Sequence, residues 1–248
     1  MTIINSQKNI FGGCSVDSAD LPSDQGEFKE RLDYSIGIWK NDGINVVWLL
    51  VTLAQSKFIP ICTAAGFIFH HADADKLQMT LTLVPGSYIP PYATHYIGAG
   101  GVVIDGEGNL LVVSERYRQG PGRRLKLPGG ALQGGEHIAA AVVREVMEET
   151  GIKAKFDYVV CLRHWHGYRY GKSDIYFVCR LTPLSKKIIM DSKEIAECLW
   201  MPVDEYLAGD EAHEFNKLIV RTAAASRSGL SEKFLESFSN ETHEFLVP

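Results

Sequence analysis

The sequence lacks a long apolar run, paired cysteines and an excess of basic residues. Its longest apolar run, residues 46–51, is far shorter than the roughly 20 residues that cross a bilayer. Residues 1–10 show no cationic start followed by an apolar stretch, the pattern of a secretory signal. The five cysteines are scattered, without a CxxC pair for zinc or redox chemistry. We therefore expect a cytoplasmic protein with buried thiols and no membrane partner.

Charge and composition exclude further classes. The 248 residues carry a formal net charge of −5, which disfavours binding to the phosphates of a nucleic acid. Apolar residues make up 46% and charged residues 22%, as in ordinary globular proteins, so disorder and disulfide scaffolds are disfavoured. At roughly 150 residues per domain, the length fits one large or two small domains.

Proline and glycine punctuate the chain near residue 90. Pro85-Gly86-Ser87 and then Pro90-Pro91 form the clearest linker, so we expect one domain over residues 1–90 and another over residues 91–248. Side-chain periodicity predicts strands and helices in mixed order, which indicates an α+β or α/β sandwich. The expected strands are 46–53, 77–83, 97–104, 110–114, 156–163, 175–181 and 197–201, the 97–104 and 110–114 strands forming a pair, and the expected helices are 20–39, 139–150, 213–225 and 231–238.

The segment 129–152, GGALQGGEHIAAAVVREVMEETGI, carries the strongest chemical signal. On a helix that starts near residue 138, one side is apolar and suited to packing on a sheet. The other side carries Glu145, Glu148 and Glu149 at the spacing of neighbouring helical side chains. Three carboxylates repel one another, and those near the helix C-terminus oppose its dipole, unless a divalent cation lies among them. Taken alone, the same run also fits a solvated acidic helix face.

The setting of these acids favours the metal site. The segment fits the pattern G-x5-E-x7-R-E-U-x-E-E-x-G-U, in which U is a bulky apolar residue. The matching residues are Gly130, Glu136, Arg144, Glu145, Val146, Glu148, Glu149, Gly151 and Ile152. The segment therefore resembles the signature of the Nudix hydrolases. Further motifs between residues 10 and 207 resemble the subgroup that contains the plant ADP-ribose/NADH Nudix hydrolases and the Nudix protein encoded antisense to basic fibroblast growth factor.

The resemblance implies an α+β protein in which a small α/β N-terminal domain precedes a C-terminal Nudix αβα sandwich with a mixed β-sheet. It also implies that Glu145, Glu148 and Glu149 are catalytic residues that coordinate Mg²⁺ or Mn²⁺. The backbone carbonyl near Gly129 is a further candidate ligand. The metal would neutralise a diphosphate and deliver a water for attack on phosphorus.

The resemblance assigns supporting roles to other residues. Glu136 and Arg144 would orient the helix and its carboxylates. A later loop completes many sites of this family with another acid, and Glu194 is our candidate for this catalytic acid. Asp174 and Glu197 are its rivals.

Two segments outside the helix indicate how a substrate would be held. Residues 115–124 carry four arginines, and residues 163–172 mix basic and aromatic side chains. Guanidinium groups bind phosphate oxygens and aromatic faces stack on bases, so the segments suit an adenine nucleotide, although solvated surface loops have the same composition. The candidate substrate-binding residues are Arg116, Arg118, Arg124, Arg163, Trp165 and Tyr168.

The substrate itself is less defined. Likeness to the subgroup favours ADP-ribose or NADH, with release of AMP. However, Tyr168 stands where many ADP-ribose enzymes of the family carry a proline, so dinucleoside polyphosphates, CoA and FAD are alternatives. A non-catalytic Nudix-fold regulatory binding protein is the alternative of another class. The intact set of three glutamates favours the enzyme.

We predict that the protein forms a homodimer to which the N-terminal domain contributes. A domain of about 80 residues buries little core of its own, and residues 46–51 with Trp39 and Trp48 add much apolar surface. The alternative is that this domain packs only on its own Nudix domain. Light scattering at micromolar concentration should give twice the chain mass of 27.5 kDa. A mass near that of one chain would rule the dimer out. If the chain stays dimeric after residues 1–90 are deleted, the N-terminal domain does not contribute to the dimer contact.

Overall fold

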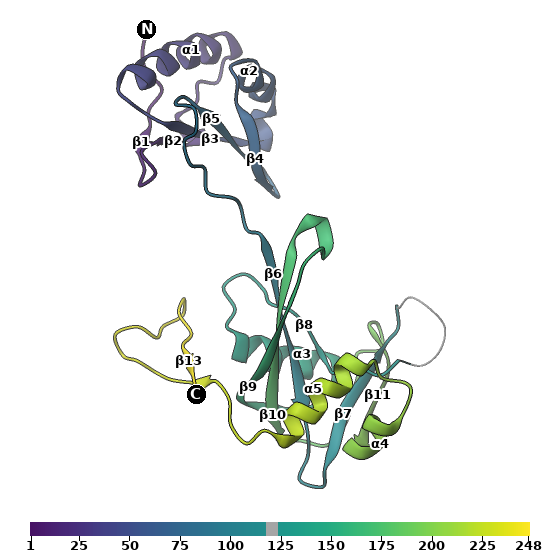
Figure 1. Cartoon of the computed structure of the whole chain (residues 1–248). Coiled ribbons are helices and arrows are strands. Elements are labelled where there is room, and N and C mark those ends of the chain that lie inside the picture. The colour runs from purple at the N-terminus through teal and green to yellow at the C-terminus, as the bar shows by residue number, and fades with distance from the viewer. Residues whose placement is uncertain (118–123) are drawn as a thin grey trace. The chain divides into compact units, whose positions relative to one another are not determined.

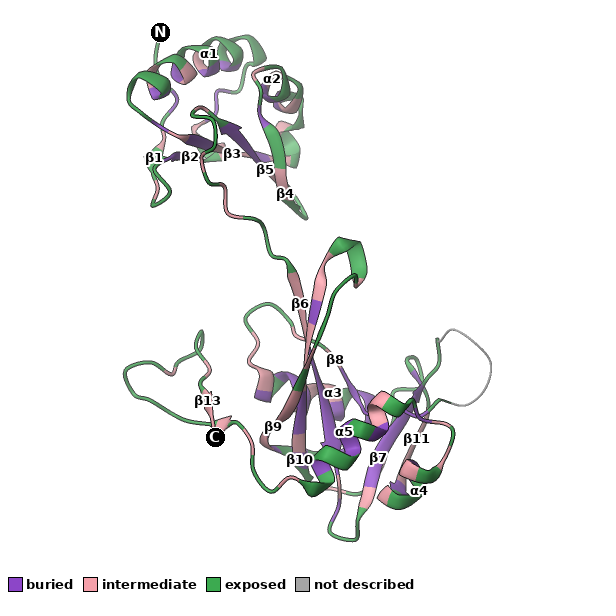
Figure 2. Ribbon diagram, viewed as in Figure 1, coloured by how far each residue is buried: buried purple, intermediate pink, exposed green. Residues whose placement is uncertain are grey.

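The chain, described by a computed structural model over residues 1–117 and 124–248, forms two compact units. The first comprises Met1–Ala93 and the second Thr94–Pro248 (Figure 1). Each unit buries its own apolar residues (Figure 2). Both units combine sheets with helices, which confirms the α+β class. Within the described residues, no helix is long and apolar enough to cross a bilayer.

The N-terminal unit is a five-stranded sheet with the order β1-β2-β3-β5-β4. The strands are β1 (Gln7–Lys8), β2 (Cys14–Val16), β3 (Val46–Thr52), β4 (Ile68–Asp73) and β5 (Lys76–Thr82). The helical segments are η1 (Ser18–Asp20), α1 (Gln25–Asn41), η2 (Leu53–Phe58) and α2 (Ile59–Ala64). Helix α1 begins at Gln25 because the Asp24 side chain accepts a hydrogen bond from Glu27 N and caps it. Phe28 and Trp39 of α1 belong to the buried core of this unit.

The C-terminal unit contains a four-stranded mixed sheet with the order β8-β6-β10-β9. Its strands are β6 (His95–Val103), β8 (Gly129–Ala131), β9 (Ala154–Trp165) and β10 (Ser173–Pro183), and only the β6–β10 pair is parallel. A two-stranded sheet pairs β7 (Asn109–Glu115) with β11 (Ile195–Pro202). The helices are α3 (Ile138–Thr150), η3 (Arg169–Gly171), α4 (Val203–Ala208) and α5 (Glu214–Ala225).

Two separate apolar clusters give this unit its layers. One joins α3 to the sheet through Val142 and Val146, which pack with Ala99 of β6. The other joins α4 and α5 to the sheet through residues such as Tyr206 and Ile219, which pack with Val102. Neighbouring residues of β6 thus point to opposite faces, as the pleat requires. The layers are those expected of a sandwich with a mixed sheet at its centre.

One expected strand pair is wrong. Residues 97–104 and 110–114 share only the single bridge between Ile104 and Leu110, and β7 pairs instead with β11. Both edges of β6 are already occupied, by β8 and by β10, so β7 has no edge of β6 left along most of its length.

The expected helix over residues 231–238 is also wrong. This segment begins with β12 (Ser231–Glu232), which pairs with β13 (Leu246–Val247), and the residues between carry no helix. Phe234 is 75% exposed, so the apolar side that periodicity assigned to a helix has no surface to pack on. A short helix without a buried face is not stable in water.

Candidate active site

Helix α3 positions the acidic residues and ends at Gly151. Gly151 adopts φ 71°, a left-handed conformation that favours glycine, and its N–H donates to the Met147 carbonyl. A Cβ at this position would lie 2.7 Å from the Ile189 carbonyl oxygen. The chain segment near Ile189 therefore packs directly on the end of the helix, and the Asp191 N–H also donates to the Glu149 carbonyl at 3.3 Å.

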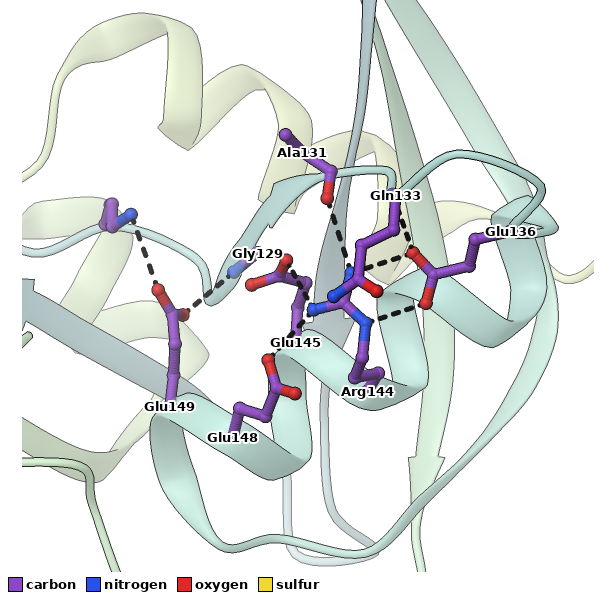
Figure 3. Close-up of polar contacts among 9 residues, drawn as sticks. Gly129, Ala131, Gln133, Glu136, Arg144, Glu145, Glu148 and Glu149 are labelled. Carbon is purple, nitrogen blue, oxygen red and sulfur yellow. Dashed lines mark hydrogen bonds and ion pairs between the residues drawn. The ribbon is translucent and has the colours of Figure 1, made fainter. Parts of the chain in front are cut away.

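The two glycines of β8 lie against carboxylates of α3, and Figure 3 shows Gly129 beside Glu149. A Cβ on Gly130 would lie 2.6 Å from Glu145 Oε2, so any side chain there would displace the carboxylate. The Gly129 N–H donates to Glu149 Oε2 at 2.9 Å. The structure thus shows the amide of Gly129 at the acidic cluster, whereas the role of its carbonyl as a metal ligand stays a proposal.

Arg144 connects three glutamates (Figure 3). Its Nε and Nη2 donate to the two oxygens of Glu136 at 2.7 and 2.8 Å, a two-point contact that fixes the loop before α3. Its Nη1 donates to Glu145 at 2.9 Å and to Glu148 at 2.8 Å. The Arg144 guanidinium holds the pKa of Glu136 below its ordinary value. Arg144 and Glu136 therefore join the loop to the helix and orient two of its carboxylates.

Glu149 differs from the other acids of α3, because it is 7% exposed whereas the Glu148 side chain is 58% exposed. We expected all three glutamates on the side of the helix away from the sheet; Glu149 instead turns toward Gly129 and Lys126, whose Nζ lies 3.9 Å from Glu149 Oε1. Burial raises the pKa of Glu149 to about 7, against the opposing effects of Lys126 and the Gly129 amide. Burial also raises the pKa of Glu145.

Lys126 and Glu115 extend the charged network and were not found from the sequence. Lys126 Nζ contacts Glu115 Oε1 at 2.5 Å because an isolated bridge pairs Val113 of β7 with Lys126. No local pattern relates the two segments. Among the described residues, the network joins two cationic side chains, Arg144 and Lys126, to five carboxylates, those of Glu115, Glu136, Glu145, Glu148 and Glu149.

The donor chemistry of this cluster fits a hard cation. Carboxylate oxygens are the ligands that Mg²⁺ and Mn²⁺ prefer, and the network has surplus negative charge, part of it buried. Within residues 1–117 and 124–248, however, no three His, Cys, Asp or Glu side chains are arranged to hold a metal ion. Arg144 Nη1 lies between Glu145 and Glu148 and donates to both, so the guanidinium supplies the positive charge between these two carboxylates. Glu145, Glu148 and Glu149 are the residues that would hold a divalent ion.

Glu194 lies in a turn that packs on the end of α3. The turn is fixed by hydrogen bonds from Glu194 N and Ile195 N to the Asp191 carbonyl, and Asp191 N contacts α3 at Glu149. Arg116 braces the same turn, because its N–H donates to the Glu194 carbonyl and its Nε donates to the Ser192 carbonyl, both at 2.7 Å. The structure thus brings Arg116 to the backbone of the turn that carries Glu194.

The rivals of Glu194 occupy different settings. Asp174 is buried and its Oδ2 lies 2.5 Å from Arg163 Nη2, so its negative charge is already paired. Glu197 belongs to β11, where its backbone lies opposite Ser114 of β7.

The aromatic candidates gather where β9 passes into β10. The Trp165 and Tyr168 ring centroids are 5.1 Å apart, and the Arg163 guanidinium carbon lies 5.4 Å from the Trp165 ring. Trp165 remains 47% exposed, so part of its indole can contact a planar ligand. Arg124 is exposed at the start of the strand-like segment that leads to β8. Arg118 lies outside the described residues.

Tyr176 of β10 links the aromatic group to the acidic cluster, and it was not found from the sequence. The Arg163 guanidinium carbon lies 5.3 Å from its ring, and its hydroxyl would be 2.7 Å from a Cβ on Gly129. Burial, with the charges of Glu149 and Glu145, raises the pKa of the Tyr176 phenol. Strand alternation alone does not say which face Tyr176 occupies, because both faces of β10 are covered.

Comparisons with known proteins bear on both units. The family model "Nudix hydrolase domain" matches residues 4–83, and "NUDIX domain" matches residues 94–222. Nudix hydrolase 8 of Arabidopsis thaliana is 37% identical over 83% of this chain, which spans 57% of that protein. Nucleoside diphosphate-linked moiety X motif 6 of Homo sapiens is 38% identical over 82% of this chain and 66% of its own length. Nudix hydrolase 5 of Arabidopsis thaliana is 34% identical over 88% of this chain and 75% of its own length.

We predict that Arg144→Lys lowers the free energy of unfolding by about 1–3 kcal/mol, because one ammonium group cannot replace the two-point contact with Glu136 while reaching Glu145 and Glu148. The measurement is urea unfolding in the presence of a chelator, so that no metal compensates. Arg227→Lys, at an exposed arginine, serves as the control. Equal stability of the two variants would show that the network contributes nothing.

Proposed function

The chain belongs to the Nudix hydrolase family, and on this premise we propose that it is a metal-dependent pyrophosphohydrolase of nucleoside diphosphates linked to another group. The observation that carries the proposal is the acidic cluster, in which five carboxylates meet two cationic side chains among the residues that the structure describes, and burial raises the pKa of Glu149 to about 7. The name of the human relative refers to the same class of compound.

The residues of the cluster have distinct roles in the proposed reaction. Glu145, Glu148 and Glu149 would hold Mg²⁺ or Mn²⁺, which when bound neutralises diphosphate oxygens and lowers the pKa of a water. Arg144 and Glu136 keep the carboxylates oriented. Glu194 is our candidate for the general base that takes a proton from the attacking water, because its turn packs on the end of α3. Glu149 is the alternative if Glu145 and Glu148 alone hold the ion, because burial raises its pKa to about 7.

For the substrate, we propose ADP-ribose or NADH, cleaved to release AMP. Trp165 and Tyr168 offer aromatic faces for the adenine, and Arg163 and Arg124 offer guanidinium groups for phosphate. Arg163 already pairs with Asp174 through Nη2, whereas the Arg124 residue is exposed. Dinucleoside polyphosphates are the second candidate because Tyr168, and no proline, completes the aromatic group.

Self-association is part of the proposal. In the N-terminal unit, β4 lies at the edge of the sheet, and two of its residues, Ile68 and Phe69, are 62% and 61% exposed. An edge strand with exposed apolar side chains is a surface on which a second chain can pack. This surface supports a homodimer in which the N-terminal unit takes part.

The test of the activity is turnover of a panel of ADP-ribose, NADH, NAD, FAD, CoA and diadenosine polyphosphates, scored for the nucleoside monophosphate released. We expect turnover of at least one compound with Mg²⁺ or Mn²⁺ and none in chelator. Glu148→Gln should lower kcat far more than it changes KM, since the metal serves the transition state. Glu205→Gln, at an exposed glutamate of α4, should match the unaltered protein. Full turnover in EDTA would contradict the proposal, and binding without turnover would favour the regulatory protein.

The role of Glu194 has its own test. Glu194→Gln should lower kcat by about 10²-fold or more if the carboxylate accepts the proton, the usual size of a general-base contribution. Lys193→Gln in the same turn controls for disturbance of the loop. A loss of less than threefold would transfer the role to Glu149, Asp174 or Glu197.

A further inference from the structure

The first turn of α3 has no cap from its own sequence. His137 occupies the N-cap position but its side chain accepts no hydrogen bond from the helix, and the first turn contains no acidic residue. The first N–H groups of a helix have no partner within the helix, and a polar side chain just before it usually supplies one. The helix that carries the acidic cluster therefore needs a partner from elsewhere in the chain.

Glu244 supplies this partner from the C-terminal segment. Its Oε2 accepts a hydrogen bond from Ile138 N at 2.9 Å, and its Oε1 accepts one from Ala139 N at 3.0 Å. The ring nitrogen Nε2 of His137 lies 3.1 Å from the Asn240 carbonyl oxygen and forms a second contact with the same segment. One carboxylate thus satisfies two amides, and its negative charge complements the positive end of the helix dipole.

The C-terminal segment also makes backbone contacts with β9 and within itself. After α5, the backbone of Leu230 bonds to Val159 of β9 in both directions, and β12 pairs with β13 over two residues. Phe234 and Phe238 remain 75% and 45% exposed. Glu244 also lies beyond residues 94–222, the part that the NUDIX domain model matches. The cap therefore comes from outside the part of the chain that the family model matches.

The position of α3 matters because its carboxylates have little free space. Glu145 lies so close to Gly130 that a Cβ there would be 2.6 Å from its oxygen, and Glu149 must reach the Gly129 amide at 2.9 Å. A small shift or fraying of the helix start would change both contacts. Small misplacements of reacting groups cost large factors in rate.

We propose that Glu244 is a positioning residue for the acidic cluster: by capping α3 from the C-terminal segment, its carboxylate fixes where Glu145 and Glu149 lie against β8. The same contact occupies the amides of Ile138 and Ala139, so these two amides are not a site for substrate phosphate. The consequence for catalysis rests on the proposed function, whereas the cap itself does not.

The test compares Glu244→Ala and Glu244→Gln with Glu241→Ala, a control at an exposed glutamate of the same segment. The protection of the Ile138 and Ala139 amides against hydrogen exchange should fall by about fivefold or more in Glu244→Ala. It should fall less in Glu244→Gln and stay unchanged in the control. Glutamine keeps the size of the side chain and one acceptor, so it carries the test if the alanine variant does not fold. Unchanged exchange in both Glu244 variants would overturn the proposal, whatever the activity.

Kinetics at a temperature where all variants are folded separate positioning from simple stabilisation. Glu244→Ala should lower kcat by about fivefold or more and change KM by less than about twofold, because Glu244 contacts the helix and not the nucleotide. Faster exchange with unchanged kcat would leave a structural cap and overturn the positioning role. If the unaltered protein turns over no compound, the proposed function fails, and titration with Mn²⁺ then tests the positioning role of Glu244. Equal Mn²⁺ affinity of Glu244→Ala and the control would overturn this role. Mn²⁺ affinity of Glu244→Ala weaker by about fivefold would support it.

Discussion

The guanidinium of Arg144 is the interaction on which the candidate site depends. It joins the loop before α3, through Glu136, to two of the helix carboxylates, Glu145 and Glu148. Without this cation, Glu136, Glu145 and Glu148 would lose the ion pairs that they share. Arg144 holds these acids together, but the described side chains of the cluster still include more carboxylates than cations. Lys126 does not balance them, because it is shared between Glu115 and Glu149. A fold that keeps carboxylates so close holds them in the arrangement that a hard cation would use.

The two ends of α3 are fixed by different means. The C-terminal end is closed by Gly151 and by the segment near Ile189, all within about forty residues of one another in the sequence. The N-terminal end depends on Glu244, more than a hundred residues away from Ile138. One end is thus encoded locally and the other only by the folded chain. The acidic residues lie between these two fixed points.

The same contrast explains what the sequence could predict. The helix expected over residues 139–150 matches α3 closely, because periodicity and the glycine that ends it are local signals. The burial of Glu149 was missed, because it depends on Gly129 and Lys126 approaching from β8 and the segment before it. The partner of β7 was missed since pairing depends on which strand edges are already used. The supposed helix over residues 231–238 failed because periodicity indicates an apolar side but not a surface to receive it.

The lack of a side chain at Gly130 has a consequence for how this site can vary. The volume that a methyl group would fill at Gly130 is taken by the carboxylate of Glu145, so the two positions behave as one unit of packing. An alanine at the first position is compatible only with a shorter acid, or a displaced one, at the second. Substitutions at Gly130 and Glu145 are therefore coupled. A change at one of the two positions limits which side chains fit at the other, although the two residues are not adjacent in the sequence.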